Sequence, residues 1–410
     1  MPTSEAEPAL TSAAERPWLF AFLIAPPAVI AIGLISGALS YLLRHEGIDP
    51  ARASGIVALL ALPHTIYFLW SPVADFGLRR RTWVLAGSAA SAIVMAVAFH
   101  RHSLASPWAV RLFFLGYCLA MIVAASAGGL MGALQSEVNR RRAGSFYQCG
   151  SLLLGGLVVF AMVSLADRFS LGMLGWIVAA AIFLPSLFAL AVPRGDPPSA
   201  HGLRETLAGI ASEFRLTFLR WDAIPYTLLI VLPMCSGAML GLLPALAVDF
   251  GVSSAQVAWM NGLGGVLLTA LGSMSAALIP VRIRAPIAYL LAGIVNAATL
   301  LIFALGPQRP AIYFAGTVLF LFTIGLCYSL FTGVVLEFLG DSGKSGGARY
   351  SIINSFGNVP VAYMTFVDGR GYAHWGPRGM PGIDAAFSIA AASLLLIYFL
   401  LRRAPRPVAA

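Results

Sequence analysis

A series of long apolar segments constrains this chain more than any other feature. A helix needs about 20 apolar residues to cross a bilayer, and twelve such segments follow one another along the 410 residues. They cover residues 18–43, 53–74, 82–99, 108–134, 146–166, 172–192, 225–249, 255–280, 284–305, 311–338, 346–368 and 380–402. Only 10% of the residues are charged, against about 25% in a soluble domain. The sequence therefore predicts an all-α polytopic membrane protein.

The basic residues are unevenly distributed between these segments. If the N-terminus is cytoplasmic, 18 of the 26 Lys and Arg residues fall on the cytoplasmic side, in agreement with the positive-inside rule. They are Arg16, Arg79, Arg80, Arg81, Arg140, Arg141, Arg142, Arg194, Arg204, Arg215, Arg220, Arg282, Arg284, Lys344, Arg349, Arg402, Arg403 and Arg406. We therefore expect both termini in the cytoplasm. The net charge of +9 then reflects topology and does not indicate a nucleic-acid partner.

A polar segment, residues 193–224, interrupts the series. It begins with Pro and Gly and continues as an amphipathic, mildly basic stretch, which we interpret as a cytoplasmic linker at the membrane surface. The linker separates an N-terminal six-helix bundle, 18–192, from a C-terminal six-helix bundle, 225–402. Residues 1–17 and 403–410 are expected to be cytoplasmic tails.

The two halves repeat each other with an offset of about 204 residues. Gly33 and Gly37 in the first segment correspond to Gly237 and Gly241 in the seventh, and basic turns follow the second and eighth segments at nearly the same offset. Paired small residues are common in membrane helices, but the shared order is evidence for duplication. Parallel six-helix repeats with a substrate site between them are the architecture of the major facilitator transporters.

A local motif supports this architecture. The sequence Ser71-Pro-Val-Ala-Asp-Phe-Gly-Leu-Arg-Arg-Arg81 lies between the second and third segments. It resembles the cytoplasmic motif Gly-x-x-x-Asp-x-x-Gly-Arg-Arg of the major facilitator superfamily. Asp75 matches the motif acid and Arg79 and Arg80 match its basic pair, whereas Ser71 and Leu78 replace the two glycines. The resemblance implies twelve helices in two pseudo-symmetric bundles and transport by alternating access.

Further stretches resemble one branch of that superfamily, the peptide/acetyl-coenzyme A/drug transporters that include the muropeptide permeases. They are the Ser-Pro before Asp75 with Arg-Arg-Arg-x-Trp after it, the stretch Ala348–Asn358, and Glu137-Val-Asn-Arg-Arg-Arg, which we place at the end of the fourth helix. Related siderophore permeases are an equally good analogy. The resemblance implies a bacterial inner-membrane permease for a bulky, partly polar organic solute.

Polar residues within the apolar segments are the candidates for contact with substrate or protons. His64, Tyr67, Ser71 and Asp75 share one helical face, and His64 titrates near neutral pH when unperturbed. The alternative is a structural histidine beside a kink at Pro63. Arg44 ends the first segment, where it either attracts an anionic substrate or extends to the interface. The remaining candidates are uncharged and serve either as cavity lining or as contacts between helices: Tyr147, Gln148, Tyr328, Asn354 and Asn358.

Charged residues at the cytoplasmic helix ends are candidates for a gate that opens and closes with the access state. Asp75, Glu137 and Glu337 each lie close to a basic turn, and their expected partners include Arg79, Arg80 and Arg140. The alternative is a solvated loop that follows the positive-inside rule alone.

Short matches to enzyme signatures, such as Asp-Phe-Gly at 75–77 and 249–251, lack the surrounding motifs that an enzyme needs and do not support catalysis. The sequence has no HExxH and no Walker motif, and we expect no catalytic residues, no metal and no cofactor. We expect a monomer that contacts membrane lipid and a small-molecule substrate, with uptake coupled to protons. An exporter of drugs or metabolites with the same fold is the nearest alternative, and a membrane-embedded transferase is a remote one.

Overall fold

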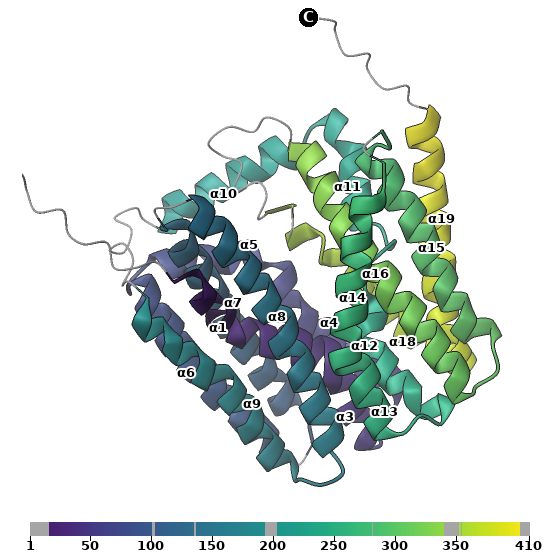
Figure 1. Ribbon diagram of the computed structural model, residues 1–410, viewed down its shortest axis with the longest axis horizontal. Helices are drawn as coiled ribbons and strands as arrows, with labels where there is room; N and C mark the ends of the chain where they lie inside the picture. The colour runs from purple at the N-terminus through teal and green to yellow at the C-terminus, as the bar shows by residue number, and fades with distance from the viewer. Residues whose placement is uncertain are drawn as a thin grey trace, which may run out of the picture.

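The computed structural model describes residues 16–100, 103–134, 137–192, 203–280, 282–339, 352–353 and 355–401, and within these residues it is helical with no strand. The helices that precede residue 192 gather in one bundle and those that follow residue 220 gather in a second bundle beside it (Figure 1). The boundaries proposed for the two halves remain a prediction.

The first bundle consists of consecutive apolar helices with short 3₁₀ or π-helical pieces. They are η1 (Pro17–Leu19), α1 (Phe20–Leu23), α2 (Ala25–Pro27), η2 (Ala28–Ala38), α3 (Leu39–His45), α4 (Pro50–Thr65), α5 (Tyr67–Trp70), η3 (Ser71–Asp75), α6 (Arg80–Phe99), α7 (Pro107–Gly132), α8 (Glu137–Leu165), α9 (Leu171–Ser186) and η4 (Leu187–Ala191). The amphipathic helix α10 (Leu203–Phe218) follows within the expected linker.

The second bundle is built in the same way. Its pieces are η5 (Trp221–Ala223), α11 (Ile224–Val231), α12 (Ala238–Leu246), η6 (Ala247–Phe250), α13 (Ser254–Val257), η7 (Ala258–Leu263), α14 (Gly264–Ser275), η8 (Ala276–Leu278), α15 (Ala285–Leu305), α16 (Pro310–Leu339), α18 (Val359–Trp375), η10 (Gly376–Arg378) and α19 (Gly379–Leu401).

Nine helical stretches in the described residues are long and apolar enough to cross a membrane, or ten if the bent pair formed by Pro50–Thr65 and Tyr67–Ala74 counts as one span. The last of the nine stretches, Val359–Leu401, contains both α18 and α19. Trp221–Val231 and Ala238–Phe250 are shorter apolar helices. The chain is thus a multi-pass membrane protein, while the count of twelve and the orientation of its termini remain predictions.

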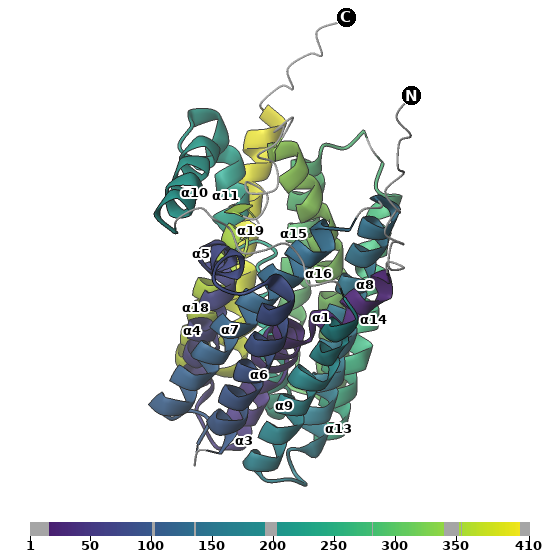
Figure 2. The same ribbon diagram turned by 90° about the vertical axis from the view of Figure 1, so that its left-hand side faces the viewer.

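Two ends of the molecule are used as reference points below. The linker side is the end at which α10 lies and α19 ends, and the far side is the end at which α3 ends and α13 begins (Figure 2). The most extensive contacts between the bundles in the described residues are those of α18 with α4, of α8 with η7, and of α12 with η2 and α3. These contacts bring the first and seventh apolar segments of the sequence together along the centre of the molecule.

Two helix boundaries differ from the sequence prediction. Glu137 does not end the fourth helix but begins α8, because the Glu- and Arg-rich stretch has good helix propensity and extends the helix beyond its apolar part. The eleventh helix does not end at 368 but continues to Trp375. The helix continues through Gly369 and Gly371 because α18 packs closely on its neighbours there, and glycine permits that approach.

Candidate functional site

A cavity of about 380 Å³ lies between the two bundles. Segments of both halves line it, including η2, α4 and α8 from the first and the residues around α12, α14, α16 and α18 from the second. Such a volume is within the range of about 300–1,000 Å³ that is typical of small-molecule sites. Its polar lining residues are Ser36, His64, Tyr117, Gln148, Ser236, Asn261, Thr269, Tyr289, Tyr328 and Asn358.

One wall of the cavity is an interruption of the seventh apolar segment. The helix ends at Val231 and resumes at Ala238, and residues 232–237 between them are not helical. Within this unwound segment Cys235 and Gly237 have positive φ values of 56° and 74°. Gly237 is required there for two reasons, because left-handed backbone favours glycine and because a Cβ atom would collide with the hydroxyl of Tyr328.

Backbone carbonyl groups in the unwound segment and at the helix end before it find partners on neighbouring helices. Tyr363 Oη donates to the carbonyl of Val231 at 2.9 Å, and Ser388 Oγ lies 3.3 Å from the carbonyl of Pro233. Tyr289 Oη donates to the carbonyl of Met234 at 3.3 Å. Non-helical backbone at membrane depth persists where such groups satisfy it or where it lines a cavity. Broken helices of this kind form substrate sites in transporters, and this one satisfies both conditions.

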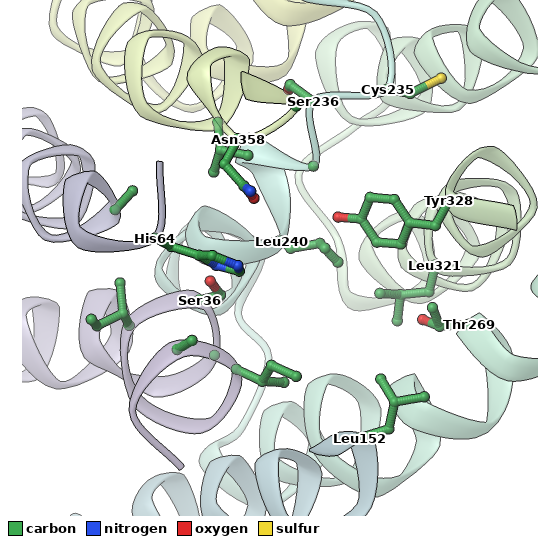
Figure 3. Close-up of a pocket in the computed structure, with 18 of the residues that line it drawn as sticks. Ser36, His64, Leu152, Cys235, Ser236, Leu240, Thr269, Leu321, Tyr328 and Asn358 are labelled. Atoms are coloured by element: carbon green, nitrogen blue, oxygen red, sulfur yellow. The ribbon is translucent and has the colours of Figure 1, made fainter. Parts of the chain in front are cut away.

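Three polar side chains converge on the cavity from different elements. The imidazole of His64, the side chain of Asn358 and the hydroxyl of Tyr328 all point into the same space (Figure 3). His64 is also held by an edge-to-face contact with Tyr117, whose ring centroid is 6.4 Å away. Asn358 comes close because Thr65 Oγ1 donates to its backbone carbonyl at 3.3 Å, which ties α18 to α4.

The lining has no fixed charge. Among the described residues that surround the cavity there is no Asp, Glu, Lys or Arg, and His64 is the single titratable base. No group of three or more His, Cys, Asp or Glu that could hold a metal ion is found in the part of the chain that the structure describes. The arrangement offers hydrogen bonds to an uncharged polar surface and apolar contacts from residues such as Leu152, Leu240 and Leu321 (Figure 3).

Polar contacts join the two bundles at the far side of the cavity. Arg44 Nη2, at the end of α3, lies 2.7 Å from Asp249 Oδ1 in η6. Tyr372 of α18 donates to the same carboxylate, 3.1 Å from each oxygen, and Arg44 lies over the Tyr372 ring at 5.7 Å. We call these three residues the far-side ion pair network. Beside it, Asp167 accepts a hydrogen bond from Ser254 Oγ of the other bundle at 3.0 Å.

The structure brings together four of the residues predicted to contact substrate. His64, Gln148, Tyr328 and Asn358 all line the cavity. Asn354 lies outside the described residues.

The other predicted contacts are placed differently. Tyr67 does not line the cavity with His64, because the second segment bends by 44° between Thr65 and Tyr67 and so breaks the face they were expected to share. Tyr147 packs against the apolar cluster around Phe20 and Leu23 and is likewise absent from the lining. Arg44 neither lines the cavity nor extends freely to the interface, because it is paired with Asp249.

The structure describes the side chains of some of the predicted gate residues. Glu337, in the last turn of α16, accepts from Arg284 Nη2 at 3.1 Å and from Tyr226 Oη at 2.6 Å. It therefore pairs with a basic turn as expected, but the partner belongs to its own half. Arg79 is exposed before α6, and the guanidinium of Arg80 lies against Gly129 of α7. The side chains of Asp75, Glu137 and Arg140 lie outside what the structure describes.

The sequence interpretation missed Asp249 and Tyr372. A signal existed for Asp249, because the repeat offset of about 204 places it within one residue of the position equivalent to Arg44. Opposite charges at equivalent ends of the first and seventh helices are positioned to pair if the two helices meet at the interface. For Tyr372 no signal existed, because the predicted eleventh helix stopped before it.

Comparisons with known proteins agree with this geometry. The family model of the Major Facilitator Superfamily matches residues 21–365. The anhydromuropeptide permease of Escherichia coli strain K12 is 28% identical over 292 residues, which cover 66% of this chain and 56% of the permease. The match thus spans about half the length of that relative.

Solved structures share the fold over nearly the whole chain. The nucleoside transporter NupG has a TM-score of 0.67 at 16% identity, and the match covers 93% of this chain and 98% of NupG. A peptide transporter of the POT type in complex with sulfate has a TM-score of 0.70 at 14% identity, with 94% of each chain covered. A D-xylose-proton symporter has a TM-score of 0.65 at 13% identity, with 92% of this chain and 95% of the symporter covered. Since the family model covers most of its length, the chain belongs to the Major Facilitator Superfamily.

Proposed function

We propose that the protein moves a bulky, partly polar organic solute of the anhydromuropeptide type across a bacterial inner membrane by alternating access. The observation that carries this proposal is the cavity between the two bundles, with its uncharged polar lining and its far side held together by the Arg44–Asp249 pair. Such a state holds substrate while one access route is blocked, as alternating access requires.

The side chains that line the cavity support the proposed class of transported solute. Sugars and peptides present many hydroxyl and amide groups, which pair with the side chains of Gln148, Asn261, Asn358 and Tyr328. A bare inorganic ion would need a fixed opposite charge or a dense set of oxygen ligands, and the described lining offers neither. The likeness to an anhydromuropeptide permease supports the same class.

The proposed direction is uptake, with the linker side in the cytoplasm. The positive-inside distribution of Lys and Arg supports this orientation. The far-side ion pair network then closes the outer access route, and the state described here is one that receives or releases solute toward the cytoplasm. We propose that a proton gradient drives accumulation, since no ATP-binding motif is present in the sequence.

Transport by purified protein tests the proposal. Proteoliposomes that contain the protein should accumulate a radiolabelled anhydromuropeptide when the outside is made acidic, and a protonophore should abolish the accumulation. Protein-free liposomes are the control. Accumulation that survives the protonophore would exclude proton coupling. If the labelled compound enters no faster than into the protein-free liposomes, the proposed cargo is wrong.

A cavity variant connects the uptake to the site. Tyr328→Phe removes one hydroxyl from the lining and should raise the half-saturating concentration about 5-fold, because a net hydrogen bond contributes about 1 kcal/mol. Tyr398→Phe, on a tyrosine of α19 outside the described lining, is the matched control and should leave that concentration unchanged. Equal values for the two variants would mean that solute does not bind at Tyr328.

A further inference from the structure

Two buried acidic side chains lie outside the cavity and have no part in the site described above. Asp368 on α18 is 0% exposed and Asp384 on α19 is 5% exposed. The two helices pack against each other in the second bundle (Figure 1). They approach closely because Gly371 and Gly379 face each other backbone to backbone, and a Cβ atom on either would collide with a carbonyl of the other helix.

The two carboxyl groups have few hydrogen-bond partners. Ser388 Oγ, one turn along α19, lies 2.9 Å from Asp384 Oδ1. Neither oxygen of Asp368 has a donor within hydrogen-bonding distance in the described part of the chain. Among the described residues, the carboxyl of Asp384 lies within interaction range of the carboxyl of Asp368. Two carboxyl oxygens can share a hydrogen bond only when one of them carries a proton.

No cation balances the two acids within the described residues. Arg52 of α4 is directed to the carbonyl of Ala105, and Arg370 of α18 lies over the ring of Phe366 at 5.1 Å. Tyr363 lies within electrostatic reach of Asp384 and is neutral at physiological pH. The other charged or titratable groups on the elements packed against the pair are His64 of α4, Tyr226 of α11, Asp249 of η6, Tyr289 of α15, Tyr372 and His374 of α18, Arg378 of η10 and Tyr398 of α19.

These observations indicate that the pair holds a proton. Two adjacent carboxylates in a medium that excludes water cannot both be ionised without a large electrostatic cost. A metal ion is a poor alternative, because the site offers two carboxyl groups and one hydroxyl, whereas Ca²⁺ or Mg²⁺ needs about six oxygen ligands. An ionisable group at membrane depth is expensive and marks a functional site by default.

We propose that Asp368 and Asp384 share one proton and form the site at which this transporter binds its coupling proton. This inference rests on the proposed function, since it assigns the proton coupling of that transport cycle to particular residues. It differs from the expectation drawn from the sequence, which placed the candidate proton carrier at His64.

Ser388 connects the pair to the substrate cavity. Its hydroxyl has a single proton to donate, yet it lies within reach of both Asp384 at 2.9 Å and the carbonyl of Pro233 at 3.3 Å. When the pair is fully ionised, the hydroxyl donates to the carboxylate. When the pair holds its shared proton, Asp384 accepts that hydrogen bond and becomes a weaker acceptor for Ser388, so that the Ser388 hydroxyl can donate to the carbonyl of Pro233 instead. Proton binding thus adds a hydrogen bond to the unwound segment 232–237 that lines the cavity.

Infrared spectroscopy of the full-length protein in detergent tests the proton site without any substrate. The wild type should show absorption from a buried protonated carboxyl group near neutral pH, and Asp368→Asn and Asp384→Asn should each lose it. Asn is nearly isosteric with a protonated Asp, so both variants are expected to fold. Asp222→Asn is the matched control, because the side chain of Asp222 is 67% exposed. Absorption that persists in both buried variants would overturn the proposal.

A transport assay separates proton coupling from the movement of solute through the protein. With an anhydromuropeptide as the probe, Asp384→Asn should keep exchange of labelled for unlabelled solute but lose accumulation driven by a pH gradient, because the amide mimics a permanently protonated acid. Accumulation equal to wild type, or accumulation that follows a sodium gradient instead, would overturn the assignment. If wild type does not carry the probe, the proposed cargo fails, and the infrared result still decides whether the pair holds a proton.

Discussion

Removal of Asp249 should shift the protein toward a state that is open at the far side. The perturbation is Asp249→Ala, which eliminates the ion pair with Arg44 and both contacts of the Tyr372 hydroxyl. Arg44 belongs to the first bundle and Asp249 to the second, so the interaction is made only while the bundles meet at this end. The ion pair is therefore lost from the closed state alone, whereas the contacts with Tyr372, which lie within the second bundle, are lost from both states and do not shift the ratio.

The size of the shift follows from the burial of the pair. The side chains of Arg44 and Asp249 are 22% and 14% exposed. An exposed ion pair contributes about 0–1 kcal/mol, whereas removing one partner from a buried pair costs about 3–5 kcal/mol. We take about 2 kcal/mol for this intermediate case, which corresponds to about a 30-fold change in the ratio of open to closed molecules. Tyr372→Phe removes a donor to Asp249 that belongs to the same bundle and keeps the ring under Arg44, so it should leave the ratio nearly unchanged.

Distances between spin labels on the two bundles measure this ratio. Phe169, between α8 and α9, and Gln308, between α15 and α16, are exposed at the far side and belong to different bundles. Cysteines at these positions, in a background without the four native cysteines, should report a longer distance when the far side opens. Asp222→Ala breaks an exposed pair with Arg220 within one segment and is the matched control. If Asp249→Ala and Asp222→Ala give the same distance distribution, the far-side ion pair network does not hold the bundles together.

Two further predictions concern packing and the unwound segment. Gly272→Val should lower the melting temperature, because Gly272 lies against a backbone carbonyl of α16 and overpacking costs about 1–3 kcal/mol. Gly209→Ala, in α10 with open space around it, is the control and should leave the melting temperature unchanged. An equal fall in melting temperature in both variants would contradict the close contact at Gly272. Tyr289→Phe removes a donor to the segment 232–237 and should speed the reaction of Cys235 with a maleimide, whereas an unchanged rate would mean that this hydrogen bond does not stabilise the segment.

The sequence predicted the helices well because apolar length is a local property. Each expected segment contains helix in the described residues, since a chain in lipid has to satisfy its backbone groups within the helix. The interruption at 232–237 was not predicted. Pro233 and Gly237 were its only local signals, and both residues also occur within continuous membrane helices.

The candidate site was predicted only in part because it depends on contacts between distant segments. His64, Gln148, Tyr328 and Asn358 were identified as polar residues in apolar segments, and they line the cavity. Tyr67 was not distinguishable from His64 without knowledge of the bend between them.

The acidic pair shows the same limit. Asp368 was placed at the end of a helix that in fact continues to Trp375, so its burial against Asp384 was invisible in the sequence. Side-chain partners such as Arg44 and Asp249, 205 residues apart, become apparent only when the bundles are assembled.

The most direct test of the central claim asks whether solute passes through the cavity between the bundles. Gln148 lines the cavity and is exposed to it, so Gln148→Trp should fill part of the cavity without disturbing the packed core. Gln308→Trp, in the exposed loop between α15 and α16, adds the same ring outside the cavity. In proteoliposomes, exchange of labelled anhydromuropeptide should be lost with Gln148→Trp and retained with Gln308→Trp. Equal exchange in the two variants would contradict transport through this cavity.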